Sequence, residues 1–438
     1  MRIESIGFRG FPPFTDGAID FPEKPESGLA EVHVLTGQNG TGKTRLLSIL
    51  GAACGNAGDL NRRQTISNDC DAYVRASAFS VHGIFRARTQ QTVWKRSSEE
   101  AESAWRKLIT NGRLDGGMAG SPNVLAFPKI NATDPPHVSA QAYRGTGRIT
   151  ETPIVAFDTV KVGQPATFVS LERPKDDDAL ICQSMANLKL SAAMEGQAGL
   201  APTESRSQKI TQRFEAAVAQ ITGRSFTFQV MSHPTVHLVA LWGGVQMKLD
   251  ALPDGLRSIV AWLIACIAKL DAQYPDHPDP LDIPLILLLD EPESHLHPAW
   301  QRKLIPAAQQ LFPNGQFFVV THSPFVISSI NSGWIHVLRA DAAGLVTADA
   351  PIPCSKGDTY IDVVEDILGV REWYDPETES LLAEFRSLRN RVVEGNAAME
   401  ELERKAENIS ARSDSLREMM SRELRQIQRN LVKDVVTQ

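Results

Sequence analysis

Apolar positions near the start of the chain predict short strands that lead into a loop. Apolar stretches at residues 1–8, 18–21 and 32–35 have the length and composition of strands. The last of them runs into a glycine-rich segment, and residues 45–53 then carry apolar side chains three and four positions apart, which predicts a helix. Strand, glycine-rich loop and helix in this order are the context of a phosphate-binding loop.

The second half of the chain alternates helices with buried strands. Residues 256–270 predict an apolar helix, and residues 283–289 form an unbroken apolar run, as in a strand that is covered on both faces. A helix at 298–311 and a second buried strand at 316–320 follow. Further expected elements are helices at 97–109 and 207–221 and strands at 153–157, 167–171, 225–231, 235–241, 245–249 and 334–339. This alternation is typical of an α/β fold.

The composition changes after Pro376. Residues 377–438 are dense in Glu and Arg, contain no proline and are interrupted at Gly395 and Asn396. Apolar side chains recur there at three- and four-residue steps, as expected of helices that pack together. We therefore expect one large domain over residues 1–375 and a charged C-terminal α-helical hairpin over residues 376–438.

Composition and charge restrict the class of protein. The 438 residues are 42% hydrophobic and 22% charged, which allows a sizeable core. With 45 basic and 52 acidic residues the net charge is −7, so a DNA contact would need a local basic patch. The five cysteines have no CxxC spacing, which argues against a disulfide framework or a zinc module. We find no signal-peptide pattern and no apolar run long enough for a bilayer, so we expect a cytoplasmic protein without a membrane partner.

Residues 37–44 carry the pattern G-x-x-x-x-G-K-T. The glycines allow backbone N–H groups to surround an anion, and the next helix adds its positive N-terminal end. Lys43 is expected to reach the β- and γ-phosphates of ATP, and the Thr44 hydroxyl to ligate Mg²⁺. An ordinary glycine-rich turn is the structural alternative. The expected cofactor-binding residues of the loop are Gly37, Gln38, Asn39, Gly40, Thr41, Gly42, Lys43 and Thr44.

Two acids end the first buried strand, and a histidine follows the second. Asp290 is expected to hold Mg²⁺ together with Thr44, and Glu291 to orient or deprotonate the attacking water. Because ligands bind at the carboxyl ends of parallel strands, His322 is expected to reach the γ-phosphate and the water. Glu291, His322 and Lys43 are thus the predicted catalytic residues. A solvated acid pair and a core histidine are the structural alternatives.

Together these residues resemble the ABC-type ATPases, in particular the branch with SMC, RecF and Rad50 heads. The similarity lies in the N-G-x-G-K-T loop, the L-L-L-D-E-P-E strand and the T-H-S-P segment. It implies a P-loop NTPase fold with a nucleotide-binding lobe at about 1–90 and 280–350 and an inserted helical lobe at about 91–279. It also implies ATP and Mg²⁺ as cofactors, and a homodimer or higher homo-oligomer that closes around ATP.

The same resemblance implies a signature segment that faces the nucleotide of the other subunit. Residues 252–258, LPDGLRS, stand in that place, but Pro253 replaces the serine of the family. A helix cap is the structural alternative. The residues expected to supply the contact instead are Asp254, Gly255, Arg257 and Ser258. The glutamine of the family's Q-loop has two candidates, Gln141 and Gln183.

A narrower resemblance concerns bacterial anti-phage systems. The segments D-E-P-E-x-H-L-H-P and T-H-S-P, residues 359–370 and the charged helices after them are similar to standalone ATPases of Septu-type and retron-associated systems. This implies ATP hydrolysis that gates a separate effector protein such as a nuclease. A RecF- or SMC-like DNA repair ATPase that binds double-stranded DNA is the second hypothesis, and a nucleotide-dependent scaffold protein with little turnover is the third.

Overall fold

The chain forms two compact units that divide between Leu368 and Gly369, a few residues before the expected boundary. The computed structural model describes residues 2–23, 28–54, 71–78, 81–88, 91–111, 139–144, 168–169, 177–199, 201, 205–233, 236–330, 332–354, 359–394 and 396–436. The strand expected at 153–157 lies outside these residues. No described helix is long and apolar enough to cross a membrane.

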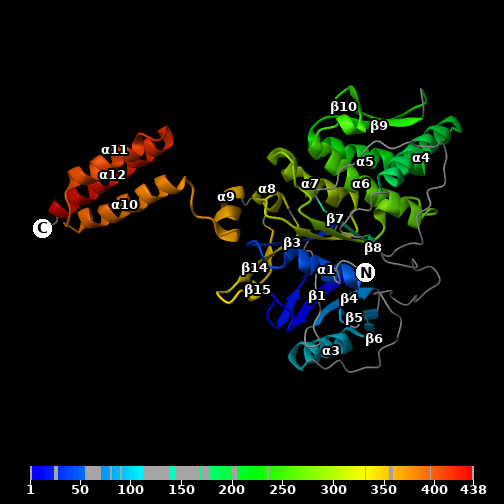
Figure 1. Ribbon diagram of the computed structural model, residues 1–438, viewed down its shortest axis with the longest axis horizontal. Coiled ribbons are helices and arrows are strands. Elements are labelled where there is room, and N and C mark those ends of the chain that lie inside the picture. Colours follow the sequence, from blue (N-terminus) through cyan, green and yellow to red (C-terminus); the bar gives the residue numbers. More distant parts are fainter. Residues whose placement is uncertain are drawn as a thin grey trace. The chain divides into compact units, whose positions relative to one another are not determined.

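The first unit is built around a mainly parallel sheet (Figure 1). Its strand order is β15-β14-β3-β13-β12-β7-β8, and β16 pairs with β14. The six strands from β14 to β8 run parallel, whereas β15 and β16 are antiparallel to β14. Their bounds are β3 Glu31–Gly37, β7 Ser139–Arg144, β8 Phe168–Val169, β12 Leu285–Asp290, β13 Gly315–Val320, β14 Trp334–Ala340, β15 Val346–Ala348 and β16 Ile352–Pro353.

Both faces of this sheet are buried, as the unbroken apolar run in β12 predicts. Leu285, Leu287 and Leu289 point into one core, together with helices α4 to α7. Ile286 and Leu288 point into a second core on the other face, together with α1 and the first strands. The helices are α1 Lys43–Ala53, α4 Asp177–Gln197, α5 Arg206–Thr222, α6 Asp254–Gln273 and α7 Pro298–Leu311. The expected core helix is therefore α6.

An antiparallel sheet of five strands packs on the α1 side. Its order is β2-β1-β4-β5-β6, and α3 (Ser98–Asn111) contacts it. The strands are β1 Arg2–Arg9, β2 Gly17–Asp20, β4 Asp71–Ala78, β5 Val81–Arg86 and β6 Gln91–Lys95. The sequence pattern predicts only β1 and β2, because β4 gains its partner from the distant β1. The structure keeps β6 and α3 with this sheet, beyond the lobe boundary expected near residue 90.

The helical lobe carries a three-stranded meander on the opposite side of the central sheet (Figure 1). Its order is β11-β10-β9, with β9 Phe226–Met231, β10 His237–Trp242 and β11 Val245–Lys248. The sequence pattern predicts all three strands but not α4, whose apolar residues are not confined to one stripe. Short helical turns complete the unit at Leu249–Ala251, Pro280–Asp282, Pro324–Ile327 (α8), Tyr360–Asp362 (α9) and Val363–Ile367.

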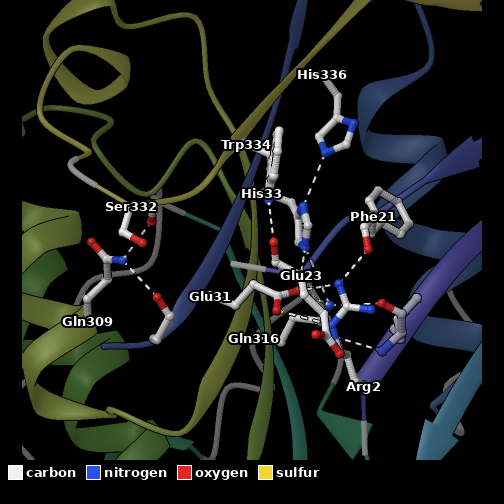
Figure 2. Close-up of polar contacts among 12 residues, drawn as sticks. Arg2, Phe21, Glu23, Glu31, His33, Gln309, Gln316, Ser332, Trp334 and His336 are labelled. Atoms are coloured by element: carbon white, nitrogen blue, oxygen red, sulfur yellow. Dashed lines mark hydrogen bonds and ion pairs between the residues drawn. The ribbon is translucent and has the colours of Figure 1, made fainter. Parts of the chain in front are cut away.

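A buried polar cluster joins the two sheets (Figure 2). Glu31 on β3 accepts hydrogen bonds from Gln316 Nε2 (2.7 Å) and Arg2 Nε (3.1 Å), and its Oε1 lies 2.7 Å from His33 Nε2. Gln316 on β13 also bonds the backbone N–H and carbonyl of Ile3 at 2.8 and 2.9 Å. The cluster thus ties β1 to β3 and β13 at the strand ends opposite the glycine-rich loop.

The described residues of the second unit form three helices where the sequence pattern predicts two. They are α10 Pro376–Val393, α11 Met399–Ser410 and α12 Asp414–Val436. The additional break at residues 411–413 has a local cause, because the Ser413 hydroxyl accepts a hydrogen bond from the Leu416 N–H (3.2 Å) and begins a new helix. The core of the unit consists of Leu382, Phe385, Leu388, Val392, Leu402, Ala406, Ile409, Leu416, Met420 and Ile427.

Candidate nucleotide-binding site

The glycine-rich loop connects β3 to α1 and depends on glycine at two positions. A Cβ atom at Gly37 would overlap the carbonyl oxygen of Leu338 on the adjacent strand β14. Gly42 has a φ of 81°, and a Cβ there would lie 2.9 Å from the ring of Phe14. The loop therefore packs closely against β14 on one side and the N-terminal turn on the other.

Lys43 begins α1 and folds back over the loop. Its Nζ donates hydrogen bonds to the carbonyl oxygens of Gly37 (2.9 Å) and Gln38 (2.8 Å). Burial lowers the pKa of Lys43, although the carboxylates of Glu291 and Asp290 act in the opposite direction. The ammonium group thus lies at the loop, where a bound phosphate would compete with the two carbonyl oxygens for its hydrogen bonds.

Thr44 and Asp290 form a pair of oxygen ligands. The Thr44 hydroxyl lies 3.2 and 3.3 Å from the two carboxylate oxygens of Asp290, at the end of β12. Adjacent hydroxyl and carboxylate oxygens suit Mg²⁺, which takes its other ligands from phosphates and water. The residues present therefore fit the expected metal. No group of three His, Cys, Asp or Glu side chains that could hold a metal occurs in the described part of the chain.

Glu291 and His322 lie close together at neighbouring strand ends. Glu291 has a left-handed φ of 50°, which the hydrogen bond from its N–H to the Val320 carbonyl (2.9 Å) supports. His322 Nε2 lies 3.8 Å from Glu291 Oε1, and both side chains are about one-third exposed. Burial and the charge of Lys43 lower the pKa of His322 more than the nearby carboxylates raise it. His322 is thus a neutral imidazole at neutral pH.

These residues line an open pocket of about 660 Å³. One wall of the pocket, formed by Pro12, Pro13 and Arg45, was not among the expected site residues. The Arg45 side chain bonds the Pro12 carbonyl and lies 5.9 Å from the centre of the Phe11 ring. No local pattern predicts this wall. The lining residues are Pro12, Pro13, Asn39, Gly40, Gly42, Lys43, Thr44, Arg45, Asp290, Glu291, Val320 and His322.

Some of the expected loop residues support the loop instead of lining the pocket. Thr41 is fully buried, and its hydroxyl bonds the Gln38 carbonyl at 2.9 Å. The two Q-loop candidates also differ in position. Gln141 lies in the middle of β7, beside Leu287 of β12, and Gln183 lies on α4, where its Nε2 donates to Asn187 Oδ1 at 2.9 Å.

The expected signature segment does not line this pocket. Pro253 precedes α6, and Asp254 is exposed in its first turn. Gly255 and Ser258 are buried, and Arg257 lies 3.7 Å from the carboxylate of Asp254. Asp254 is therefore the most exposed of the residues that are expected to contact a nucleotide on another subunit.

The fold and the pocket define the class of protein. The parallel sheet carries a glycine-rich loop before a helix, an acid pair at the end of a buried strand and a histidine at the next strand end. This combination is that of a P-loop ATPase fold. The inserted helical lobe lies between β7 and β12 in the chain. The fold class expected from the sequence is confirmed.

Comparison with protein families gives a match to residues 161–328 with the family described as "AAA domain, putative AbiEii toxin, Type IV TA system". The match covers less than half of the chain. It includes Asp290, Glu291 and His322, whereas the glycine-rich loop lies outside it.

Parts of the chain are also similar to two proteins named probable ATPases and to a Septu protein. It is 38% identical over 95 residues to the Retron Ec83 probable ATPase of Escherichia coli, with 22% of this chain and 18% of that protein aligned. It is 29% identical over 106 residues to the Retron Vc95 probable ATPase of Vibrio cholerae (24% and 21%), and 24% identical over 170 residues to the Septu protein PtuA of Bacillus thuringiensis (38% and 43%). The resemblance to retron- and Septu-type proteins is confirmed, over less than half the length of each relative.

Similar solved structures include an SMC head bound to the C-winged helix domain of ScpA. It has 12% sequence identity and a TM-score of 0.42, over 81% of this chain and 98% of that chain. The recombination mediator protein RecF has 12% identity and a TM-score of 0.36, over 80% of this chain and 98% of that chain.

Proposed function

We propose that the protein binds ATP with Mg²⁺ and hydrolyses it to ADP and phosphate. The observation that carries this proposal is the arrangement of Lys43, Thr44, Asp290, Glu291 and His322, which come from three separate segments and line one pocket. Thr44 and Asp290 would hold the metal, which when bound would neutralise part of the phosphate charge.

Positioning and charge stabilisation are the main contributions of the chain in this mechanism. The loop N–H groups and the Lys43 ammonium bind the β- and γ-phosphates and stabilise the charge of the transition state. Glu291 accepts a proton from the attacking water. His322, neutral and 3.8 Å from Glu291, orients the same water and the γ-phosphate by hydrogen bonds.

We further propose that two chains close head-to-tail around ATP, in a homodimer or a higher homo-oligomer. Residues 252–258 do not line the pocket of their own chain, and the exposed Asp254 at the start of α6 would bring this segment to the pocket of another chain. The N-terminal end of α6, with its positive partial charge, would face the γ-phosphate.

The partner that we propose is a separate effector protein such as a nuclease, gated by ATP in anti-phage defence. The similarity to retron ATPases and to the Septu protein PtuA supports this role. A nucleotide-dependent scaffold with little turnover is the second candidate. It is favoured by Pro253 in place of a serine and by the burial of Ser258, because the segment then offers no exposed hydroxyl.

Turnover and oligomeric state of three proteins test the proposal: the wild type, Glu291→Gln and Lys43→Ala. Glu291→Gln should bind ATP normally and hydrolyse it roughly 100-fold more slowly or worse, because a general base contributes about that factor. With ATP it should sediment as a dimer. Lys43→Ala should lose ATP binding and dimer formation together.

Each part of the proposal has its own contrary result. Wild-type turnover in Glu291→Gln would overturn the assignment of the base. Sedimentation as a monomer with ATP would contradict the dimer. ATP binding without turnover in the wild type would favour the scaffold, and turnover stimulated by double-stranded DNA would favour the repair-type ATPase over the defence role.

A further inference from the structure

The loop after β12 contains a third acid, Glu293, that the mechanism above does not use. Its side chain is only 3% exposed. Oε1 accepts a hydrogen bond from the Thr321 hydroxyl, and Oε2 is buried without a hydrogen-bond partner of ordinary geometry in the described part of the chain. A buried carboxylate with so few polar contacts is costly, so this environment favours the neutral acid.

Thr321 connects Glu293 to the segment that carries His322. It is fully buried at the end of β13, and its Oγ1 also accepts a hydrogen bond from the Ser323 N–H (2.9 Å). The Ser323 hydroxyl in turn donates to Gln301 Oε1 on α7 (2.6 Å). His322 therefore lies between two residues whose positions are fixed by hydrogen bonds, one to Glu293 and one to α7.

Glu293 also lies close to the proposed base. Burial and the negative charge of Glu291 raise the pKa of Glu293 to about 8, so that Glu293 is mainly protonated at neutral pH. The other ionisable groups that line the pocket beside Glu291 are Lys43 and Arg45 on α1, Asp290 at the end of β12 and His322 after β13. The charge of Glu291 acts on both Lys43 and His322.

We propose that Glu293 is a positioning residue for hydrolysis: its buried carboxyl holds the turn of Thr321 and His322 in place beside Glu291. This inference rests on the proposed ATPase function. A neutral acid suits the role because it accepts the Thr321 hydrogen bond without placing a second negative charge next to the base and the γ-phosphate. An ionised acid there would repel both.

Three variants distinguish the role of the hydrogen bond between Thr321 and Glu293 from the role of the proton on Glu293. Glu293→Gln stays neutral and keeps a carbonyl oxygen for Thr321, so its turnover should be close to that of the wild type at neutral pH. Glu293→Ala and Thr321→Val each remove the hydrogen bond. Their kcat should fall roughly 10- to 100-fold, because a shift of about 1 Å in a reacting group can cost that much. The KM for ATP should change little, since the phosphate-binding residues remain.

The pH profile distinguishes a positioned acid from ordinary packing. Turnover of the wild type should fall as the pH rises through about 8, where Glu293 ionises beside Glu291. The Glu293→Gln variant should lack this fall, because an amide does not titrate. The same alkaline fall in Glu293→Gln, or wild-type kcat in Glu293→Ala, would overturn the inference.

Infrared spectroscopy of the protein without ATP gives a readout that does not depend on turnover. A carbonyl band of a protonated, buried carboxyl should be present at neutral pH in the wild type and absent in Glu293→Gln. An active wild type without this band would overturn the inference about Glu293. A wild type that shows the band but never hydrolyses ATP would support the neutral acid and contradict the ATPase proposal, so the two failures are distinguishable.

Discussion

At the scale of single residues, the cluster around Glu31 shows how a charge is held in the interior (Figure 2). Burial by itself would raise the pKa of Glu31, but hydrogen bonds from His33 and Arg2 outweigh it and lower the pKa to about 2. Burial lowers the pKa of His33 and of His336, which lies 3.1 Å away, so both imidazoles are neutral at neutral pH. Arg2 is thus the cation that balances Glu31.

The low pKa of Glu31 predicts an acid-sensitive stability. The folded protein keeps Glu31 ionised at pH values where the unfolded chain protonates it, so its contribution is complete above about pH 4.5 and is lost as the pH falls towards about 2. Glu31→Gln should lower the free energy of unfolding at neutral pH by about 2 kcal/mol, the value of a hydrogen bond to a charged group. Urea unfolding at several pH values measures this difference in the free energy of unfolding.

The matched control is Glu99→Gln, which removes an exposed acid on α3. This substitution should leave both the stability and its pH dependence almost unchanged. If the wild type and Glu31→Gln lost stability identically between pH 5 and pH 2, the ionised state of Glu31 would not be what supports the junction of the two sheets.

At the scale of elements, the start of α6 packs tightly on the loop between β12 and α7. A Cβ atom at Gly255 would lie 3.0 Å from Leu296 Cδ2 and 3.1 Å from the backbone oxygen of His295. His295 itself has a left-handed φ of 68°, so its backbone has little freedom to move away. Gly255→Ala should therefore lower the free energy of unfolding by about 1–3 kcal/mol, as overpacking does.

Gly196 provides the comparison for this substitution. It lies on α4, is exposed, and a Cβ atom there would meet no heavy atom within 4 Å. Gly196→Ala should stabilise the protein by about 0.4–1 kcal/mol, because alanine loses less backbone entropy on folding. Thermal unfolding of both variants measures the difference. Equal shifts would mean that the start of α6 is not packed against the loop as described.

At the scale of the whole molecule, the two units have separate hydrophobic cores. Leu402 belongs to the core of the second unit and Leu287 to that of the first, and both are fully buried. Leu402→Ala should cost the second unit about 2–5 kcal/mol. ATP binding and turnover should stay at the wild-type level, because every residue of the pocket belongs to the first unit.

Leu287→Ala should lower the free energy of unfolding of the first unit by a similar amount. ATP should stabilise this variant less than it stabilises the wild type. Denaturant unfolding with and without ATP, followed by turnover assays, compares the two variants. Loss of ATP binding in Leu402→Ala would show that the second unit contributes to the site.

Several features of the fold can be predicted from short segments of the sequence. The glycine-rich loop, the buried strands β12 and β13 and the acid pair at the end of β12 follow from glycine spacing and apolar periodicity, which act within a few residues. In the stripe of apolar residues predicted for the last helix, Leu416, Met420 and Ile427 are buried and Leu424 is half-buried, whereas the side chains of Leu431 and Val435 lie outside the described residues. The roles of Glu291 and His322 stay predictions, although the fold places them side by side.

The remaining features arise only when the chain folds, because they depend on residues that are distant in the sequence. β4 becomes a strand through its pairing with β1, and Arg45 reaches the turn of Pro12 by folding of the N-terminal segment. Glu293 is neutral because its neighbours remove it from water and place Glu291 beside it. Long-range pairing and desolvation leave no periodic trace in a sequence, so the wall of the pocket, the antiparallel sheet and the neutral acid emerge only in the folded chain.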